Sequence, residues 1–100
     1  METANSIPIA GLADICRRFG IVECSVFGSA ATGDLARAND VDFLISLQAG
    51  VVLDFDEYAN LENELSALCG KPVDVINARF VRNPFLRKSI AESRRVLYAA

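Results

Sequence analysis

The chain contains no histidine, and its three cysteines lie far apart in the sequence. Without histidine, the commonest general base is missing, and so is every serine–histidine or cysteine–histidine nucleophile pair. No zinc site is expected, because such sites use histidine or clustered cysteine ligands. We expect the cysteines to be buried free thiols. Any chemistry must therefore use carboxylates, hydroxyls, basic groups or bound metal ions.

Long apolar segments are also absent. No apolar run approaches the roughly 20 residues that a membrane-spanning helix needs. The first residues carry neither the basic segment nor the apolar core of a signal peptide. We therefore expect a cytoplasmic protein without a membrane partner. One hundred residues, 52% of them hydrophobic, suffice for one compact domain, and we predict a single domain over residues 1–100.

Acidic and basic side chains are divided unevenly along the chain, which has a net charge of −3. Residues 31–70 carry eight acids and one base, whereas residues 71–100 carry seven bases and two acids. A site for metal ions and a polyphosphate would need both signs nearby, but two solvated faces would give the same count, which alone favours the solvated faces. The overall acidity argues against direct nucleic-acid binding, which depends on neutralising phosphates.

Hydrophobic periodicity predicts alternating helices and strands. Residues 94–98 form either the last turn of a helix or a closing strand, and the strand is favoured. The other expected elements are a helix over residues 8–19, strands over 21–27, 41–47 and 73–76, a helix capped by Asp54 and ended by Gly70, and a helix that begins at Asn83. This order indicates a small α/β fold with a three- or four-stranded mixed sheet flanked by helices. The helix after Asp54 would cross over between the second and third strands.

A glycine–serine pair and two aspartates follow one another at a spacing typical of a phosphate site. Gly28 and Ser29 end the first strand, and Asp40-Val41-Asp42 opens the second after ten further residues. A tight turn of this kind presents backbone N–H groups to a phosphate, and carboxylates at positions i and i+2 of a strand point to the same side. Each feature alone is more often a plain turn or a solvated edge. Together they indicate a place where a triphosphate and hard metal ions meet.

Asp74 is the only acid on the third predicted strand, and it would approach Asp40 and Asp42 if the second and third strands are neighbours. Three converging carboxylates repel one another unless cations lie between them. Oxygen ligands of this kind suit Mg²⁺ or Mn²⁺. Two such ions would hold the attacking and leaving oxygens of an in-line displacement at phosphorus. Asp74 would then be placed to take the proton of an incoming hydroxyl.

The Gly28-to-Asp42 segment resembles the G-S-x10-D-x-D signature of polymerase-β-like nucleotidyltransferases, and the chain is most similar to their minimal, single-domain members. The similarity extends to Val73-Asp74-Val75 and to the closing segments 83–87 and 96–98. Two positions depart from the family pattern. Thr32 stands where arginine is frequent, and Asn39 stands where serine is usual. Arg37 or the basic tail could replace the lost cation at the triphosphate.

The resemblance implies a polymerase-β-like fold and an Mg²⁺-dependent nucleotidyltransferase with ATP as its substrate. It assigns catalysis and metal binding to Asp40, Asp42 and Asp74, and nucleotide binding to Gly28, Ser29 and Arg37. It further implies the antitoxin of a HEPN/MNT toxin–antitoxin pair, which silences the HEPN ribonuclease by transferring AMP to one of its tyrosines. A homo- or hetero-oligomer is therefore expected, since a domain this small cannot enclose a second substrate by itself.

Two other functions remain open. The protein could be an antitoxin that acts by contact, with a site weakened by Thr32. It could instead be a nucleotidyltransferase for a small molecule such as an aminoglycoside, with a partner subunit completing the pocket. The presence of all three aspartates favours catalysis over a decayed site, which has no reason to keep them.

Overall fold

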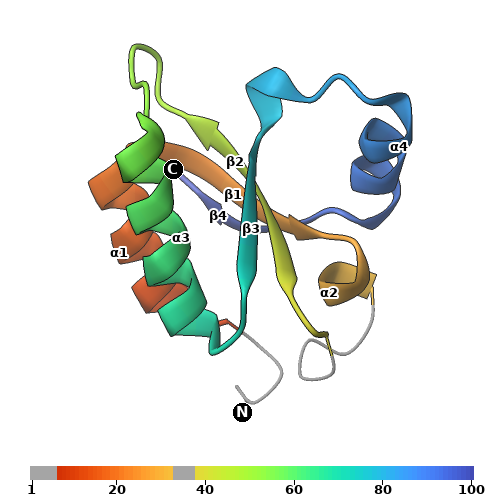
Figure 1. The fold of residues 1–100 in the computed structure, drawn as a ribbon, viewed down its shortest axis with the longest axis horizontal. Coiled ribbons are helices and arrows are strands. Elements are labelled where there is room, and N and C mark those ends of the chain that lie inside the picture. Colours follow the sequence, from red (N-terminus) through yellow and green to blue (C-terminus); the bar gives the residue numbers. More distant parts are fainter. Residues whose placement is uncertain (1–6, 33–37) are drawn as a thin grey trace.

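The computed structural model describes residues 7–32 and 38–100, and Figure 1 shows its chain of alternating helices and strands. In order these are α1 (Ile9–Phe19), β1 (Ile21–Phe27), α2 (Ser29–Thr32), β2 (Val41–Leu47), α3 (Phe55–Cys69), β3 (Val73–Asn77), the 3-10 helix η2 (Ala78–Phe80), α4 (Pro84–Ser93) and β4 (Arg95–Ala99). The predicted bounds of β1 and β2 are correct. The closing segment forms a strand, as the pattern favoured, and the third strand is one residue longer than predicted.

The four strands form one mixed sheet in the order β3-β2-β1-β4. Strand β1 pairs antiparallel with β2 and with β4, whereas β2 and β3 are parallel. A parallel pair requires a crossover connection, and α3 provides it. The predicted mixed sheet, its flanking helices and the crossover are therefore confirmed.

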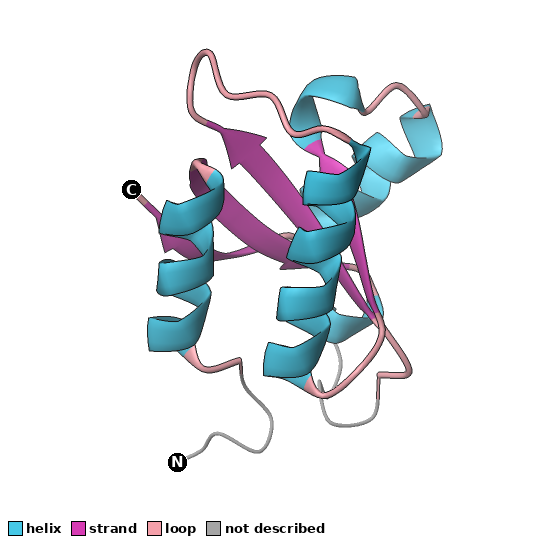
Figure 2. Cartoon of the chain, turned by 60° about the vertical axis from the view of Figure 1, so that its left-hand side comes forward, coloured by secondary structure: helices cyan, strands magenta, loops and turns pink. Residues whose placement is uncertain are grey.

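The two faces of the sheet have different partners. Helices α1 and α3 lie side by side against one face, and α4 lies on the opposite side (Figures 1 and 2). The main core fills the space under α1 and α3, where Val41, Phe43 and Ile45 of β2 are fully buried. Because side chains alternate along a strand, Asp42 and Leu44 point to the α4 side. Leu44 belongs there to a second, smaller apolar cluster.

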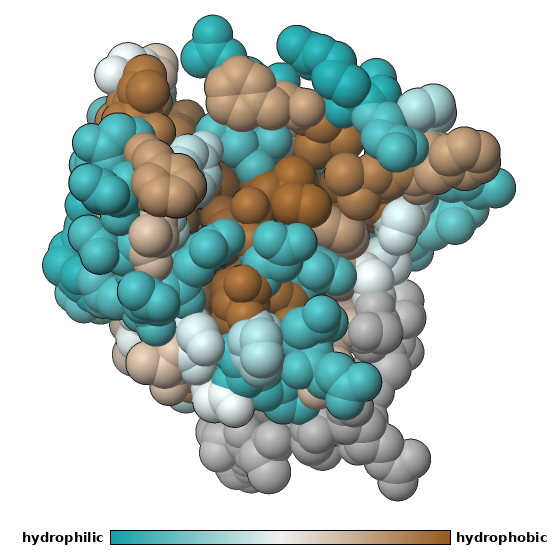
Figure 3. All heavy atoms as spheres, viewed as in Figure 1, coloured by the Kyte–Doolittle hydropathy of each residue, from teal (hydrophilic) through white to brown (hydrophobic). Residues whose placement is uncertain are grey.

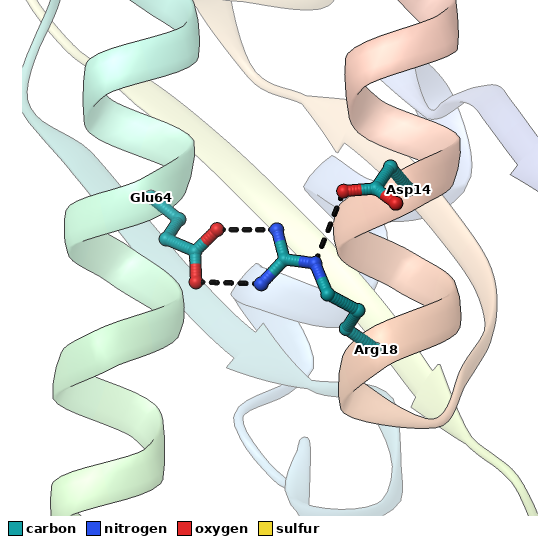
Figure 4. Close-up of polar contacts among 3 residues, drawn as sticks. All are labelled: Asp14, Arg18 and Glu64. Atoms are coloured by element: carbon teal, nitrogen blue, oxygen red, sulfur yellow. Dashed lines mark hydrogen bonds and ion pairs between the residues drawn. The ribbon is translucent and has the colours of Figure 1, made fainter.

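Helix α3 has well-defined ends and a polar link to α1. A capping box begins it: the Asp54 carboxylate accepts from the Glu57 N–H at 2.8 Å, and the Glu57 carboxylate accepts from the Asp54 N–H at 2.9 Å. In Figure 4, Arg18 of α1 reaches Glu64 of α3, and it donates to one Glu64 oxygen at 2.9 Å. Arg18 also donates to Asp14 at 3.0 Å. The Arg18–Glu64 pair links α1 to α3, whereas the Arg18–Asp14 bond lies within α1 and orients the arginine.

The expectation that all three cysteines are buried free thiols is correct for Cys16 and Cys24 and wrong for the burial of Cys69, which ends α3. The three cysteines are free thiols; Cys16 and Cys24 are buried, whereas Cys69 is partly exposed. None of the helices in the described part of the chain is long and apolar enough to cross a membrane.

Candidate active site

Parallel pairing brings the aspartates of β2 and β3 together. Asp42 lies opposite Asp74 in the register of these two strands. Neighbouring strands are about 4.8 Å apart, and directly paired residues project to the same face. Asp40 precedes β2 by one residue. The second and third strands are thus neighbours, as the prediction for Asp74 required.

The three carboxylates influence one another electrostatically. The pKa of Asp42 is raised, chiefly because its side chain is partly removed from water and further because Asp40 and Asp74 are negatively charged. Asp40 and Asp74 are exposed, and Asp42 is half-buried. Within residues 7–32 and 38–100, however, no three acidic or cysteine side chains are grouped tightly enough to hold a metal ion as they stand. The carboxylates are thus near enough to influence one another without forming a closed set of ligands.

The glycine turn lies directly against Asp42. Phe27, the last residue of β1, is paired with Asp42, so the next residue, Gly28, passes beside that carboxylate. Gly28 adopts a positive φ of 75°, and a Cβ atom added to it would lie only 3.3 Å from Asp42 Oδ2. The absence of a side chain at position 28 therefore leaves open space beside the carboxylate.

Helix α2 follows this turn immediately. Ser29 is its first residue, and the Ala31 N–H donates to the Gly28 carbonyl oxygen at 3.1 Å. Ala30 and Ala31 are buried in the main core, which fixes the helix in place. Arg37 lies outside the described residues, so its role at the nucleotide stays a prediction.

The sequence did not point to Ser93, the last residue of α4. The Gly28 N–H donates to Ser93 Oγ at 2.8 Å, and Ser93 Oγ donates to the Ser89 carbonyl oxygen at 2.7 Å. The amide predicted to face a phosphate therefore already has a protein partner in this state. Ser93 belongs to no recognisable motif, and only the packing of α4 across the end of β1 reveals the contact.

A second contact at the same corner holds α4 and β4 on the sheet. Arg94 Nε donates to Ser25 Oγ at 3.1 Å, and the Arg94 guanidinium forms an ion pair with Glu23 at 2.6 Å. Ser25 is 1% exposed, so this bond also satisfies a buried hydroxyl. Ser93 and Arg94 together fix α4 over the face that carries the aspartates.

Lys71 links the segments that carry the aspartates. Its ammonium group donates to the Ala38 carbonyl oxygen at 2.7 Å, just before Asp40. The Val41 N–H donates to the Pro72 carbonyl oxygen at 3.0 Å. The start of β3 is thus tied to the start of β2, which sets the position of Asp40 relative to Asp74. No sequence motif indicates Lys71 either, because its role depends on strand pairing.

The family described as "Polymerase beta, Nucleotidyltransferase" matches residues 11–100 of this chain. The chain belongs to that family. The protein adenylyltransferase MntA of Thermococcus cleftensis is 33% identical to it over 76 residues, which cover 76% of this chain and 75% of that protein. The resemblance found in the sequence is therefore confirmed, and the chain is a nucleotidyltransferase.

Solved structures share the fold. A toxin–antitoxin complex with AMP-PNP contains a chain that matches with a TM-score of 0.73 at 18% identity, covering 94% of this chain and 75% of that one. A tri-AMPylated Shewanella oneidensis HEPN toxin in complex with MNT antitoxin gives a TM-score of 0.65 at 15% identity, covering 92% and 70%. At these identities the likeness shows the fold alone, and it agrees with the predicted polymerase-β-like architecture.

Proposed function

We propose that this protein transfers AMP from ATP to a tyrosine hydroxyl of a HEPN-type toxin and thereby acts as its antitoxin. The observation that carries the proposal is the junction of three strand ends. There Asp42 lies opposite Asp74 on β3 and directly against the Gly28 turn of β1. The turn offers space for phosphates, and the carboxylates offer ligands for the cations that phosphates require.

The residues of this site fit Mg²⁺. Asp40, Asp42 and Asp74 provide only carboxylate oxygens, which are the ligands that Mg²⁺ and Mn²⁺ prefer. The pKa of Asp42 is raised first by partial burial and then by the charges of Asp40 and Asp74, and a bound cation would stabilise the ionised carboxylate against both. One or two bound ions would supply positive charge to the phosphates of ATP. We propose all three aspartates as the ligands.

The chain's own residues would orient the two reactants. Gly28 lets the phosphates approach Asp42 closely, because a side chain there would occupy the space. Asp74 is exposed and would accept the proton of the incoming hydroxyl. The oxygen of that hydroxyl forms a bond to the α-phosphorus, the bond between the α- and β-phosphates breaks, and pyrophosphate leaves.

The openness of the site supports a protein as the acceptor. Asp40 and Asp74 are both exposed, so no element of the described chain covers them. A partner that brings its own hydroxyl would close the site and exclude water. The relative from Thermococcus cleftensis is named a protein adenylyltransferase, and the related Shewanella oneidensis complex holds an AMPylated HEPN toxin. A hetero-oligomer with such a toxin is the arrangement we propose.

The test incubates the protein with ATP, MgCl₂ and its HEPN-type partner, and then measures the intact mass of the partner. We expect an added AMP mass that is lost with Asp40→Asn or Asp42→Asn. Asp56→Asn changes an exposed acid of the first turn of α3 and should leave transfer intact. Inhibition of the partner without a mass change would replace this proposal with an antitoxin that acts by contact. Adenylylation of an aminoglycoside instead of the partner would point to a small-molecule acceptor.

A further inference from the structure

A separate cleft of about 600 Å³ lies between α4, η2 and the sheet. Figure 3 shows apolar surface gathered in the middle of this face of the molecule, with hydrophilic residues around it. The floor of the cleft includes Leu44 of β2 and Ile90 of α4, which pack together in the smaller apolar cluster. Its lining also contains four arginines: Arg79, Arg82, Arg87 and Arg94. Gly28 and the three aspartates do not line it, so the cleft is distinct from the candidate active site.

The four arginines of the lining differ in their partners. Arg94 is bound to Glu23 and Ser25, and the Arg79 guanidinium lies 5.9 Å from the centre of the Phe80 ring. Arg82 and Arg87 form no ion pair with any residue in the described part of the chain, and the described lining contains no acid. Several like charges gathered in one concave place repel one another. An anionic ligand would relieve this repulsion.

The shape and chemistry of the cleft favour a nucleotide over other anions. Its volume is typical of small-ligand sites, which span roughly 300–1,000 Å³. Guanidinium groups bind phosphate through two parallel hydrogen bonds and also stack on aromatic rings. An acidic peptide would use the arginines but would leave the apolar floor uncovered, whereas a nucleotide carries both a phosphate and a flat base.

We propose that this cleft is a second nucleotide site, which holds a nucleoside monophosphate group with its phosphate at Arg82 and Arg87 and its base on the apolar floor. The cleft is close to the candidate active site. Leu44 follows Asp42 by two residues on the same face of β2, which places the two about 7 Å apart along the strand. A group bound in the cleft would therefore be a neighbour of the transferred phosphate.

The same chemistry has two possible sources: free AMP, or an AMP group already attached to the acceptor protein. The second source rests on the proposed function. An attached AMP exposes ribose hydroxyls, and one of these could attack the α-phosphorus of a further ATP. A new oxygen–phosphorus bond forms, pyrophosphate leaves, and the hydroxyl proton passes to Asp74. The toxin of the related complex is tri-AMPylated, and a site that holds the attached nucleotide would support such repeated transfer.

The first test measures AMP binding by calorimetry in the presence of EDTA, so that it does not depend on the metal or on transfer. We expect one AMP per chain, and Arg82→Ala/Arg87→Ala should weaken binding roughly tenfold or more, because two charge-assisted contacts are lost. The control Arg17→Ala/Arg95→Ala removes the same charge from two exposed arginines outside the cleft and should bind normally. Asp42→Asn should also bind normally. Absence of AMP binding, or equal binding by the cleft variant, would overturn the proposal.

Native mass spectrometry with saturating Mg²⁺ and AMP-PNP then tests whether the two sites are distinct. We expect chains that carry one AMP-PNP and one AMP together. If AMP-PNP displaces AMP, the cleft is part of the ATP site and the proposal of a second site is wrong. A polyglutamate peptide should not compete with AMP, and strong competition would instead make the cleft a docking site for an acidic protein.

The number of AMP groups added to the partner distinguishes the two sources. If attached AMP is the ligand, the cleft variant should add the first group at the normal rate and fail to add more. An unchanged number of groups would exclude that source and leave free AMP as the ligand. If no protein variant transfers AMP to the partner, the proposed function fails, but the two binding measurements still decide whether the cleft is a nucleotide site.

Discussion

Gly28→Ala tests the geometry of the candidate active site directly. Gly28 has a φ of 75°, in the left-handed region that costs a residue with a Cβ atom about 1–2 kcal/mol. The new Cβ would also lie 3.3 Å from Asp42 Oδ2, so the carboxylate must move by a few tenths of an ångström. The substitution therefore has two effects, one on the backbone and one on the proposed metal ligand.

Gly70→Ala separates these two effects. Gly70 ends α3 with a φ of 71°, and a Cβ atom there would have no neighbour within 4 Å. It incurs the same backbone cost of about 1–2 kcal/mol far from any carboxylate. In a domain of this size, each kcal/mol lowers the melting temperature by about 4–8 °C. Urea denaturation should therefore show similar losses of unfolding free energy for the two variants.

Transfer activity should distinguish the variants. Initial rates of AMP transfer are measured at saturating ATP and at a temperature where both variants are folded. The rate should fall about tenfold or more for Gly28→Ala alone, because small displacements of groups at a reacting centre reduce the rate strongly. Gly70→Ala should match the unmodified protein. Equal rates in the two variants would refute the inference that position 28 must be empty for Asp42 to work.

Two further predictions concern charge. Asp42→Asn should raise the melting temperature at neutral pH without metal, because the raised pKa of Asp42 means that its ionised form destabilises the fold. This gain in melting temperature should shrink as pH falls through the raised pKa of Asp42. It should vanish below the ordinary value of 3.8, where Asp42 is protonated in both the folded and the unfolded chain. Scanning fluorimetry across this pH range measures the effect, and a lower melting temperature of the variant at neutral pH would contradict the prediction. Arg18→Ala should lower the melting temperature slightly at low salt. The loss should be smaller in 1 M NaCl, where charges are screened within about 3 Å. The control Lys88→Ala removes an exposed ion pair with 4.0 Å between its charged atoms and should not change the melting temperature measurably. A loss for Arg18→Ala that is independent of salt would show that packing of its side chain, and not its charge, links α1 and α3.

Local sequence signals were sufficient for the elements that position the site. Strands β1 and β2 were predicted with correct bounds because β-branched and aromatic residues fill them and a glycine follows each closely. Asp54 and Gly70 set the ends of α3, since a capping aspartate and a left-handed glycine act within one turn of the chain. These signals also predicted a crossover helix between the second and third strands, but they left open whether the two strands are neighbours in the sheet.

Contacts between distant segments could not be predicted in the same way. The pairing of Asp42 with Asp74 was conditional on strand order, which depends on how α3 packs and not on either aspartate. The bonds of Lys71 and Ser93 join segments that are far apart in the sequence, and neither residue stands out by its type. The Gly28 amide illustrates the consequence: its turn was predicted, but its bond to Ser93 appears only once α4 lies across the end of β1.

The fold places acidic and basic residues from different parts of the sequence near one another. The count of acids and bases favoured two solvated faces, yet Asp42 lies on the same side of the sheet as the arginine cleft, and about 7 Å along β2 separates it from Leu44 on the cleft floor. On the other side of the sheet, where α1 and α3 must be held together, Arg18 is neutralised by Glu64 and Asp14. On the α4 side, Asp42 remains near like charges and Arg82 has no ion-pair partner among the described residues. Arg94 of the same cleft is paired with Glu23, so the feature that sets this side apart is narrower: one half-buried acid beside two others, and a cleft arginine without an ion pair among the described residues. These charges of opposite sign lie near each other on one side of the sheet, and a ligand that carries both phosphate and a cation would neutralise them, which argues for ligands on the α4 side.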